Sequence, residues 1–137
     1  MSKVFYNKLI RDHIQQTIID KGESCEVREI VDDAELQQEL LKKIREEGSA
    51  LARVRTRVDF LDEYADLMVV LDSLTALMGF SEADIQIAIE ENIKRKGFYN
   101  NRHFLHWSDD EGYQSNETPQ GVKEEWTHLY AIQEWQK

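Results

Sequence analysis

The apolar positions of this chain recur at helical spacing over three long segments. The first covers residues 32–51, the second covers residues 58–78 and is dominated by Leu, Met and Val, and the third covers residues 81–97. Such a periodicity predicts helices that bury one apolar side each. The apolar residues that set the pattern in the first segment are Leu36, Leu40, Leu41 and Ile44.

Polar residues mark the expected start of each long helix. Asp32–Glu35, Thr56-x-x-Asp59 and Ser81-x-x-Asp84 each place a capping side chain three residues before an acidic residue. This pattern is typical of capping boxes and first helical turns. Gly97 is suited to end the third helix, while Gly48 weakens the first one by about 1 kcal/mol relative to alanine.

Less regular segments flank these helices. Residues 3–11 predict a short extended arm, followed by a helix over residues 14–21 that Asp12 can cap and Gly22 ends. Residues 23–31 are compatible with a short strand or with an extended connector. We expect a closing extended segment over residues 98–107.

The remaining residues predict an extension of the main domain. Residues 108–121 are polar, and Val122, Trp126, Leu129 and Tyr130 mark one face of a terminal amphipathic helix. We therefore expect an all-α domain over residues 1–107. Residues 108–137 would form a linker and a C-terminal helix that packs on the same domain or on a neighbouring subunit.

Bulk properties narrow the classes of partner. The chain has 137 residues and a formal net charge of −10, which argues against a nucleic-acid partner because phosphate backbones require a basic surface. Cys25 is the single cysteine, no apolar run exceeds residues 67–71, and the N-terminus has no apolar secretory core. A cytoplasmic protein without a membrane span is expected.

Two pairs of neighbouring acidic residues are the clearest candidates for a functional site. Glu46-Glu47 lies in the first long segment, and Asp62-Glu63-x-x-Asp66 lies in the second. Glu63 and Asp66 are three residues apart, so they share one helical face. Clustered carboxylates on an inner face would suit Mg²⁺ or Mn²⁺. The alternative is an acidic surface stripe that faces water, and the pattern alone slightly favours the stripe.

Four short stretches extend this picture to a family: Tyr6–Asp12 (YNKLIRD), Lys42–Glu47, Asp62–Asp66 and Asn92–Phe98. Together they resemble motifs of the all-α nucleoside triphosphate pyrophosphohydrolases, in the MazG-like and phosphoribosyl-ATP pyrophosphohydrolase group. The N-terminal heptad is the most specific of them. The resemblance implies a helical bundle that assembles as a homodimer or homotetramer.

The resemblance also implies a reaction and a site. Members hold Mg²⁺, with Mn²⁺ as an alternative, and split a nucleoside triphosphate into a nucleoside monophosphate and pyrophosphate; a house-cleaning role on non-standard nucleotides is one form of this activity. Carried over to this chain, the catalytic and metal-binding residues are Glu47, Glu63 and Asp66. The substrate-binding residues are Asn92, Lys94 and Arg95, although the two cations also suit the end of a helix.

One position departs from the family pattern. A fourth metal ligand is expected three residues after Glu47, where this chain has Ala50. A second hypothesis is therefore a catalytically impaired scaffold that binds a small ligand or a protein. The roles of several cations stay open between phosphate binding and a structural role, which is favoured for all of them: Lys8, Arg11, Arg53, Arg55 and Arg57.

Overall fold

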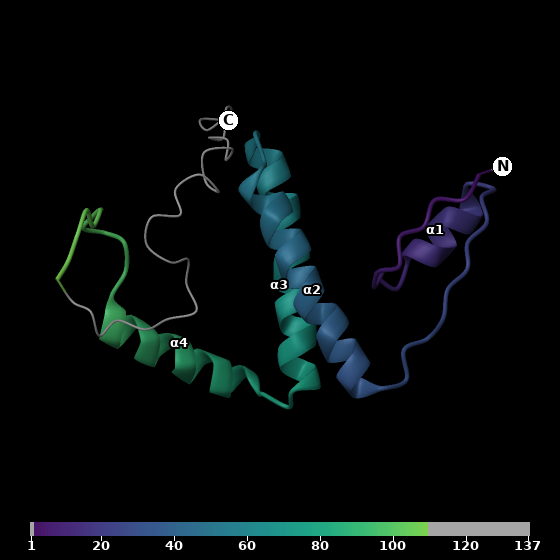
Figure 1. The fold of residues 1–137 in the computed structure, drawn as a ribbon. Coiled ribbons are helices and arrows are strands. Elements are labelled where there is room, and N and C mark those ends of the chain that lie inside the picture. The colour runs from purple at the N-terminus through teal and green to yellow at the C-terminus, as the bar shows by residue number, and fades with distance from the viewer. Residues whose placement is uncertain (1, 110–137) are drawn as a thin grey trace. The chain divides into compact units, whose positions relative to one another are not determined.

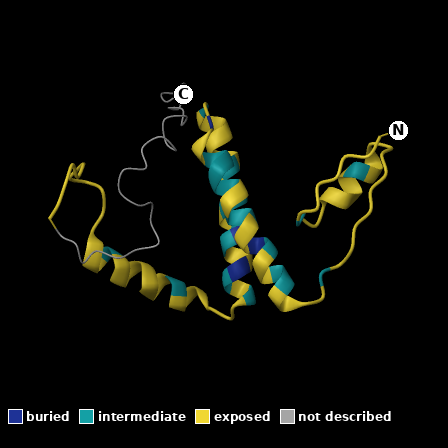
Figure 2. Ribbon diagram, in the orientation of Figure 1, coloured by how far each residue is buried: buried dark blue, intermediate teal, exposed yellow. Residues whose placement is uncertain are grey.

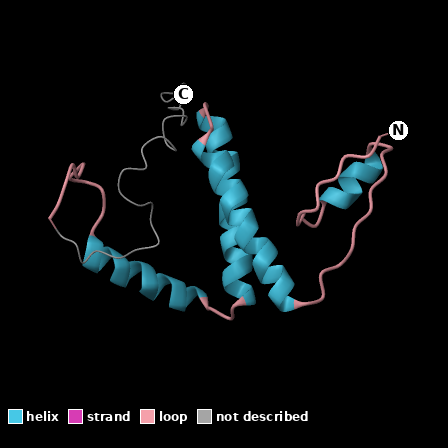
Figure 3. Cartoon of the chain, in the orientation of Figure 1, coloured by secondary structure: helices cyan, strands magenta, loops and turns pink. Residues whose placement is uncertain are grey.

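The computed structural model describes residues 2–109, and it confirms an all-α fold (Figure 1). Within this part of the chain there are four helices and no strand (Figure 3). The described residues fall into two units, 2–79 and 80–109, and each is considered by itself. The helices are α1 (Ile14–Asp20), α2 (Asp33–Ala52), α3 (Arg57–Leu77) and α4 (Glu82–Lys96).

Helices α2 and α3 pack side by side and form the core of the first unit. Leu40 of α2 and Val70 and Leu74 of α3 are buried between them (Figure 2). Together with the partly buried Leu36 and Ile44 of α2 and Leu77 of α3, they recur at spacings of three and four, so each helix turns one apolar stripe toward the other. Partly buried residues packed around this cluster are Leu9, Leu36, Ile44 and Leu77.

The predicted start signals of the long helices are confirmed. The Thr56 hydroxyl accepts a hydrogen bond from the Asp59 amide at 3.0 Å. Ser81 and Asp84 form a reciprocal capping box at the start of α4. Asp32 caps α2 by accepting from the amide of Ala34, whereas the following acid of that motif, Glu35, accepts two hydrogen bonds from Arg28 instead.

The ends of the helices also follow the sequence signals. Gly97 follows α4 with φ of 77°, a left-handed conformation that glycine adopts without steric cost. Lys94, Arg95 and Lys96 lie in the last turn of α4, where cations suit the helix dipole. Helix α2 continues through Gly48 without interruption, since packing against α3 offsets a weak local propensity.

Some local predictions were wrong. His13, not Asp12, is the N-cap of α1, and its side chain makes no capping hydrogen bond. Of the two alternatives left open for residues 23–31, the connector is confirmed, because these residues form neither helix nor strand and no strand in the described part of the chain can pair with them. Residues 98–107 contain a turn in which the Arg102 amide donates to the Tyr99 carbonyl.

Two further predictions concern residues that the structure does not describe. The amphipathic helix expected near the C-terminus lies outside residues 2–109. The domain boundary expected at 107/108 lies at the end of this range. Both stay predictions.

Helix α3 is apolar on a second side as well. Phe60, Leu61, Tyr64 and Met68 are 36–67% exposed, and the rings of Phe60 and Tyr64 stack with centroids 6.0 Å apart. Leu61, Tyr64 and Met68 lie on a different side of the helix from Val70 and Leu74, which face α2, and Phe60 lies at the border between the two sides. A helix that is apolar on two sides is typically covered on both.

No single helix among residues 2–109 is long and apolar enough to cross a membrane. Only α3 and α4 taken together would reach that length and composition.

Candidate functional site

Three carboxylates extend the apolar stripes between α2 and α3 toward the connecting turn. On α2, Glu47 follows Ile44 at the spacing that places it on the side facing α3. On α3, Glu63 and Asp66 precede Val70 on the side facing α2. The same helix pairing that buries Leu40 and Leu74 therefore brings acids from both helices together.

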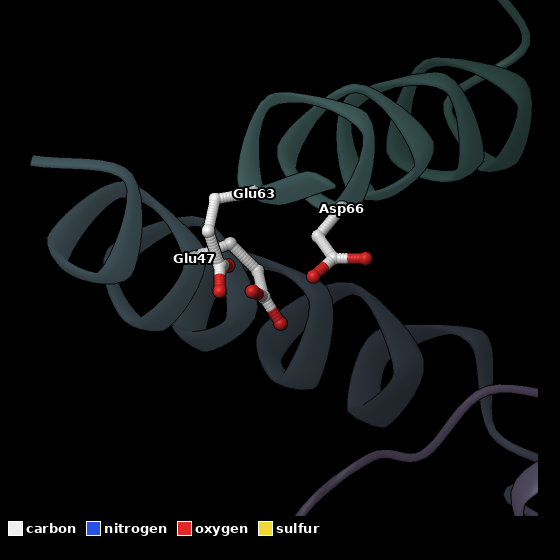
Figure 4. A group of neighbouring side chains, drawn as sticks. All are labelled: Glu47, Glu63 and Asp66. Atoms are coloured by element: carbon white, nitrogen blue, oxygen red, sulfur yellow. The ribbon is translucent and has the colours of Figure 1, made fainter. Parts of the chain in front are cut away.

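The three acidic side chains converge closely enough to share one ion. Ligand oxygens of Glu47, Glu63 and Asp66 lie within 4.8 Å of one another, and all three residues are partly buried. Figure 4 shows Glu47 reaching from α2 toward the two carboxylates of α3. Asp59 and Asp62 of the predicted acidic stripe are exposed, whereas Glu63 and Asp66 are partly buried and converge with Glu47.

Burial and neighbouring like charges disfavour ionisation of Glu63. The pKa of Glu63 is raised, first because burial removes water from its carboxylate and then because Asp66, Glu47 and Asp62 carry like charge nearby. A positive ion at this position would relieve the repulsion.

Lysine side chains supply part of the missing positive charge from α2 and the N-terminal arm. Lys43 Nζ lies 3.2 Å from Glu47 Oε1 and 3.3 Å from Glu46 Oε2. Lys8 Nζ donates to Glu46 Oε1 at 2.9 Å, and this hydrogen bond lowers the pKa of Glu46 and raises that of Lys8. Glu46 is therefore an ion-pair partner beside the three-carboxylate group.

Arg11 lies close to one of the three convergent carboxylates, that of Asp66. Its Nη1 atom lies 3.6 Å from Asp66 Oδ1, and both side chains are at least one-third exposed. The ion pair between Lys8 and Glu46 agrees with the structural role favoured for Lys8, whereas Arg11 pairs with one of the three convergent acids. Sequence reasoning missed Lys43, although its position four residues before Glu47 is the signal that could have found it.

The donor set fits a hard divalent cation. Carboxylate oxygens are the ligands that Mg²⁺ and Mn²⁺ prefer, and Mg²⁺ commonly takes few protein ligands and fills its other positions with water and phosphate. Ala50 is partly buried one turn after Glu47 and offers no side-chain oxygen. The residues present thus suit one ion better than two.

The other predicted site residues are not members of the three-carboxylate group. Asn92, Lys94 and Arg95 are exposed on α4, which belongs to the second unit, whereas the three-carboxylate group consists of residues of the first unit. Asp62 is exposed beside Glu63. The arginines at positions 53, 55 and 57 lie at the turn between α2 and α3, because Arg53 is the C-cap of α2 and Arg57 begins α3.

Comparisons with protein-family models, curated proteins and solved structures gave no match to this chain.

Proposed function

We propose that this protein is a Mg²⁺-dependent nucleoside triphosphate pyrophosphohydrolase. The observation that carries the proposal is the convergence of Glu47, Glu63 and Asp66 from two helices, with ligand oxygens within 4.8 Å of one another. The motif resemblance supports the substrate class, because its four stretches include these acids and the YNKLIRD sequence, whose Lys8 and Arg11 pair with neighbouring acids. It also supports a bundle of the all-α pyrophosphohydrolase type.

Metal binding and substrate binding are assigned to different residues of the chain. Glu47, Glu63 and Asp66 would hold the ion between α2 and α3. When bound, Mg²⁺ (or Mn²⁺) supplies positive charge to the phosphate oxygens and lowers the pKa of a coordinated water. Water then replaces pyrophosphate at the α-phosphorus, which leaves a nucleoside monophosphate. Asn92, Lys94 and Arg95 are proposed to bind the substrate.

The second apolar side of α3 supports an oligomer. Phe60, Leu61, Tyr64 and Met68 form a stripe with substantial exposure next to a helix pair that buries few residues of its own. Covering this stripe with another helix would extend the core. A homodimer or homotetramer, as the resemblance implies, would provide such a helix.

The direct test is pyrophosphate release from a panel of standard and modified nucleoside triphosphates with Mg²⁺ or Mn²⁺. Glu63→Gln removes one ligand charge with little change in shape, so we expect turnover to fall by a factor of about 100 or more. Asp62→Asn is the matched control, because it removes the adjacent, exposed charge; it should retain activity within about threefold.

Two results would contradict the proposal. One is the absence of turnover across the panel in folded protein, and the other is equal activity in Glu63→Gln and the wild type.

Ala50 favours a second candidate function, a scaffold that binds metal or nucleotide without hydrolysing the nucleotide. Metal-dependent binding of a nucleotide without pyrophosphate release would select that candidate.

A further inference from the structure

The N-terminal arm places one cation on each helix of the candidate site. Lys8 pairs with Glu46 of α2, and Arg11 pairs with Asp66 of α3. Leu9 lies between them in sequence and packs against the buried cluster around Leu40. Asn7 has φ of 47°, a left-handed turn residue directly before this stretch. The arm thus crosses the helix pair beside the acids.

The ion pair between Arg11 and Asp66 contributes little to holding the arm against the helix pair. Arg11 and Asp66 are 3.6 Å apart, beyond ordinary hydrogen-bond distance, and their side chains are 55% and 38% exposed. Exposed pairs of this kind contribute about 0–1 kcal/mol. Leu9 contributes apolar packing with the core, which is the stronger reason for the arm to dock. The guanidinium is consequently held loosely.

Arg11 and a metal ion would compete for the same carboxylate. Asp66 is both the partner of Arg11 and one of the three convergent acids. If its oxygens bind a cation, the guanidinium loses its partner while its backbone stays anchored next to Leu9. A phosphate group bound at the three acids together with the cation would lie beside the guanidinium, because Arg11 is 3.6 Å from Asp66. A planar guanidinium can hold phosphate through two parallel hydrogen bonds.

We propose that Arg11 is a substrate-binding residue that contacts a phosphate group of the nucleoside triphosphate after exchanging its partner Asp66 for that phosphate. This inference rests on the proposed function, and it assigns to the arm a part of the substrate site that the acids and α4 do not supply. Asp66 then links the two events, because occupation by the metal frees the residue that binds the phosphate.

The experiment compares Arg11→Gln with Arg28→Gln in the full-length protein. Arg28 is the matched control, because it pairs with Glu35, which lies twelve residues, or roughly 18 Å along α2, before Glu47. Three quantities are measured: KM and kcat for a nucleoside triphosphate, the affinity for inorganic triphosphate with Mg²⁺, and the affinity for Mn²⁺ alone. Arg11→Lys keeps the charge but loses the two-point geometry.

We expect Arg11→Gln to raise KM and weaken triphosphate binding by about tenfold or more, the usual effect of losing a charged hydrogen bond. Mn²⁺ affinity should be equal to or tighter than in the wild type, since a competitor for Asp66 is gone. Arg11→Lys should restore only part of the triphosphate affinity. Arg28→Gln should resemble the wild type in all three measurements.

Different results overturn different claims. If the wild type turns over substrate but Arg11→Gln and Arg28→Gln share its KM and triphosphate affinity, the role of Arg11 is refuted while the proposed function stands. Weaker Mn²⁺ binding in Arg11→Gln with an unchanged KM would assign Arg11 a purely structural role. If the wild type shows no turnover, the proposed function fails, and triphosphate binding still decides the role of Arg11; no binding by the wild type refutes it.

Discussion

The two ends of the α2–α3 pair use the same helix faces for opposite purposes. Toward the free ends of the pair, Leu40, Val70 and Leu74 close into an apolar cluster. Toward the connecting turn, Glu47, Glu63 and Asp66 take the corresponding positions, and their carboxylates face one another. The apolar end gains free energy from burial, whereas at the acidic end burial, and then repulsion from like charges, raises the pKa of Glu63.

This difference indicates that the apolar end supports the acidic end. Positioning like charges close together is unfavourable without an ion, so other interactions must hold the two helices in register. The cluster around Leu40 and the anchored arm provide those interactions. Three predictions test this division between support and chemistry.

The largest expected effect lies at the apolar end. Leu40 is 5% exposed, and its neighbour Leu41 is 50% exposed on the same helix. Leu40→Ala should lower the free energy of unfolding by about 2 kcal/mol or more, because it removes buried contacts and leaves a cavity. Leu41→Ala should cost less than about 1 kcal/mol. Chemical denaturation measures both, and equal losses would show that the apolar end is not the support.

The next effect lies at the acidic end and depends on Mg²⁺. A free Mg²⁺ concentration 100 times its Kd should stabilise the wild type by about 2.7 kcal/mol, seen as a higher Tm. Glu63→Gln should abolish this rise, and without Mg²⁺ it should melt at a higher temperature than the wild type because one repelling charge is gone. Asp62→Asn should keep the Mg²⁺ response. A Mg²⁺ response that persists in Glu63→Gln would remove Glu63 from the metal site.

The smallest effect concerns the pair Lys8–Glu46 at the edge of the acidic end. The hydrogen bond from Lys8 holds the pKa of Glu46 below its ordinary value. Its contribution to stability is therefore present above the unfolded pKa of a glutamate, about 4.3, and is lost as the pH falls through the lower folded value. Lys8→Gln should cost less than about 1 kcal/mol at pH 7.

The pH dependence of this loss provides the check. The difference in free energy of unfolding between Lys8→Gln and the wild type should shrink as the pH falls below the folded pKa of Glu46. It should also shrink at 1 M salt, which screens exposed charges. A difference that stayed constant from pH 7 to pH 3 would assign the effect to packing of the lysine stem against Tyr6, whose ring centroid lies 5.8 Å from Lys8 Nζ.

Local sequence signals were sufficient for the helices. Thr56 and Ser81 cap the segments that the sequence predicted, and Gly97 follows α4 at the expected residue. These interactions join residues only a few positions apart, so periodicity and capping chemistry reveal them. The helix α1 is the instructive exception, because Asp12 and His13 are adjacent candidates and the choice of cap depends on how the arm enters the helix.

The site was predictable only in part, for a physical reason. Sequence showed that Glu63 and Asp66 share a helical face, and a resemblance added Glu47; neither could show which face of each helix is turned inward. The distances between Glu47 and the acids of α3, and the approach of Arg11 to Asp66, depend on how α2, α3 and the arm dock.

The chain by itself therefore determined its helices, the N-caps of the three long ones and the residue types that could bind a cation, because each follows from contacts within one or two helical turns. Tertiary structure decided that three of these acids converge, that Glu46 is paired with lysines, and that the arm presents Arg11 to Asp66. Those relations join residues up to 55 positions apart in the sequence (11 to 66). They arise because burial of the Leu40 cluster fixes the register in which the helices meet.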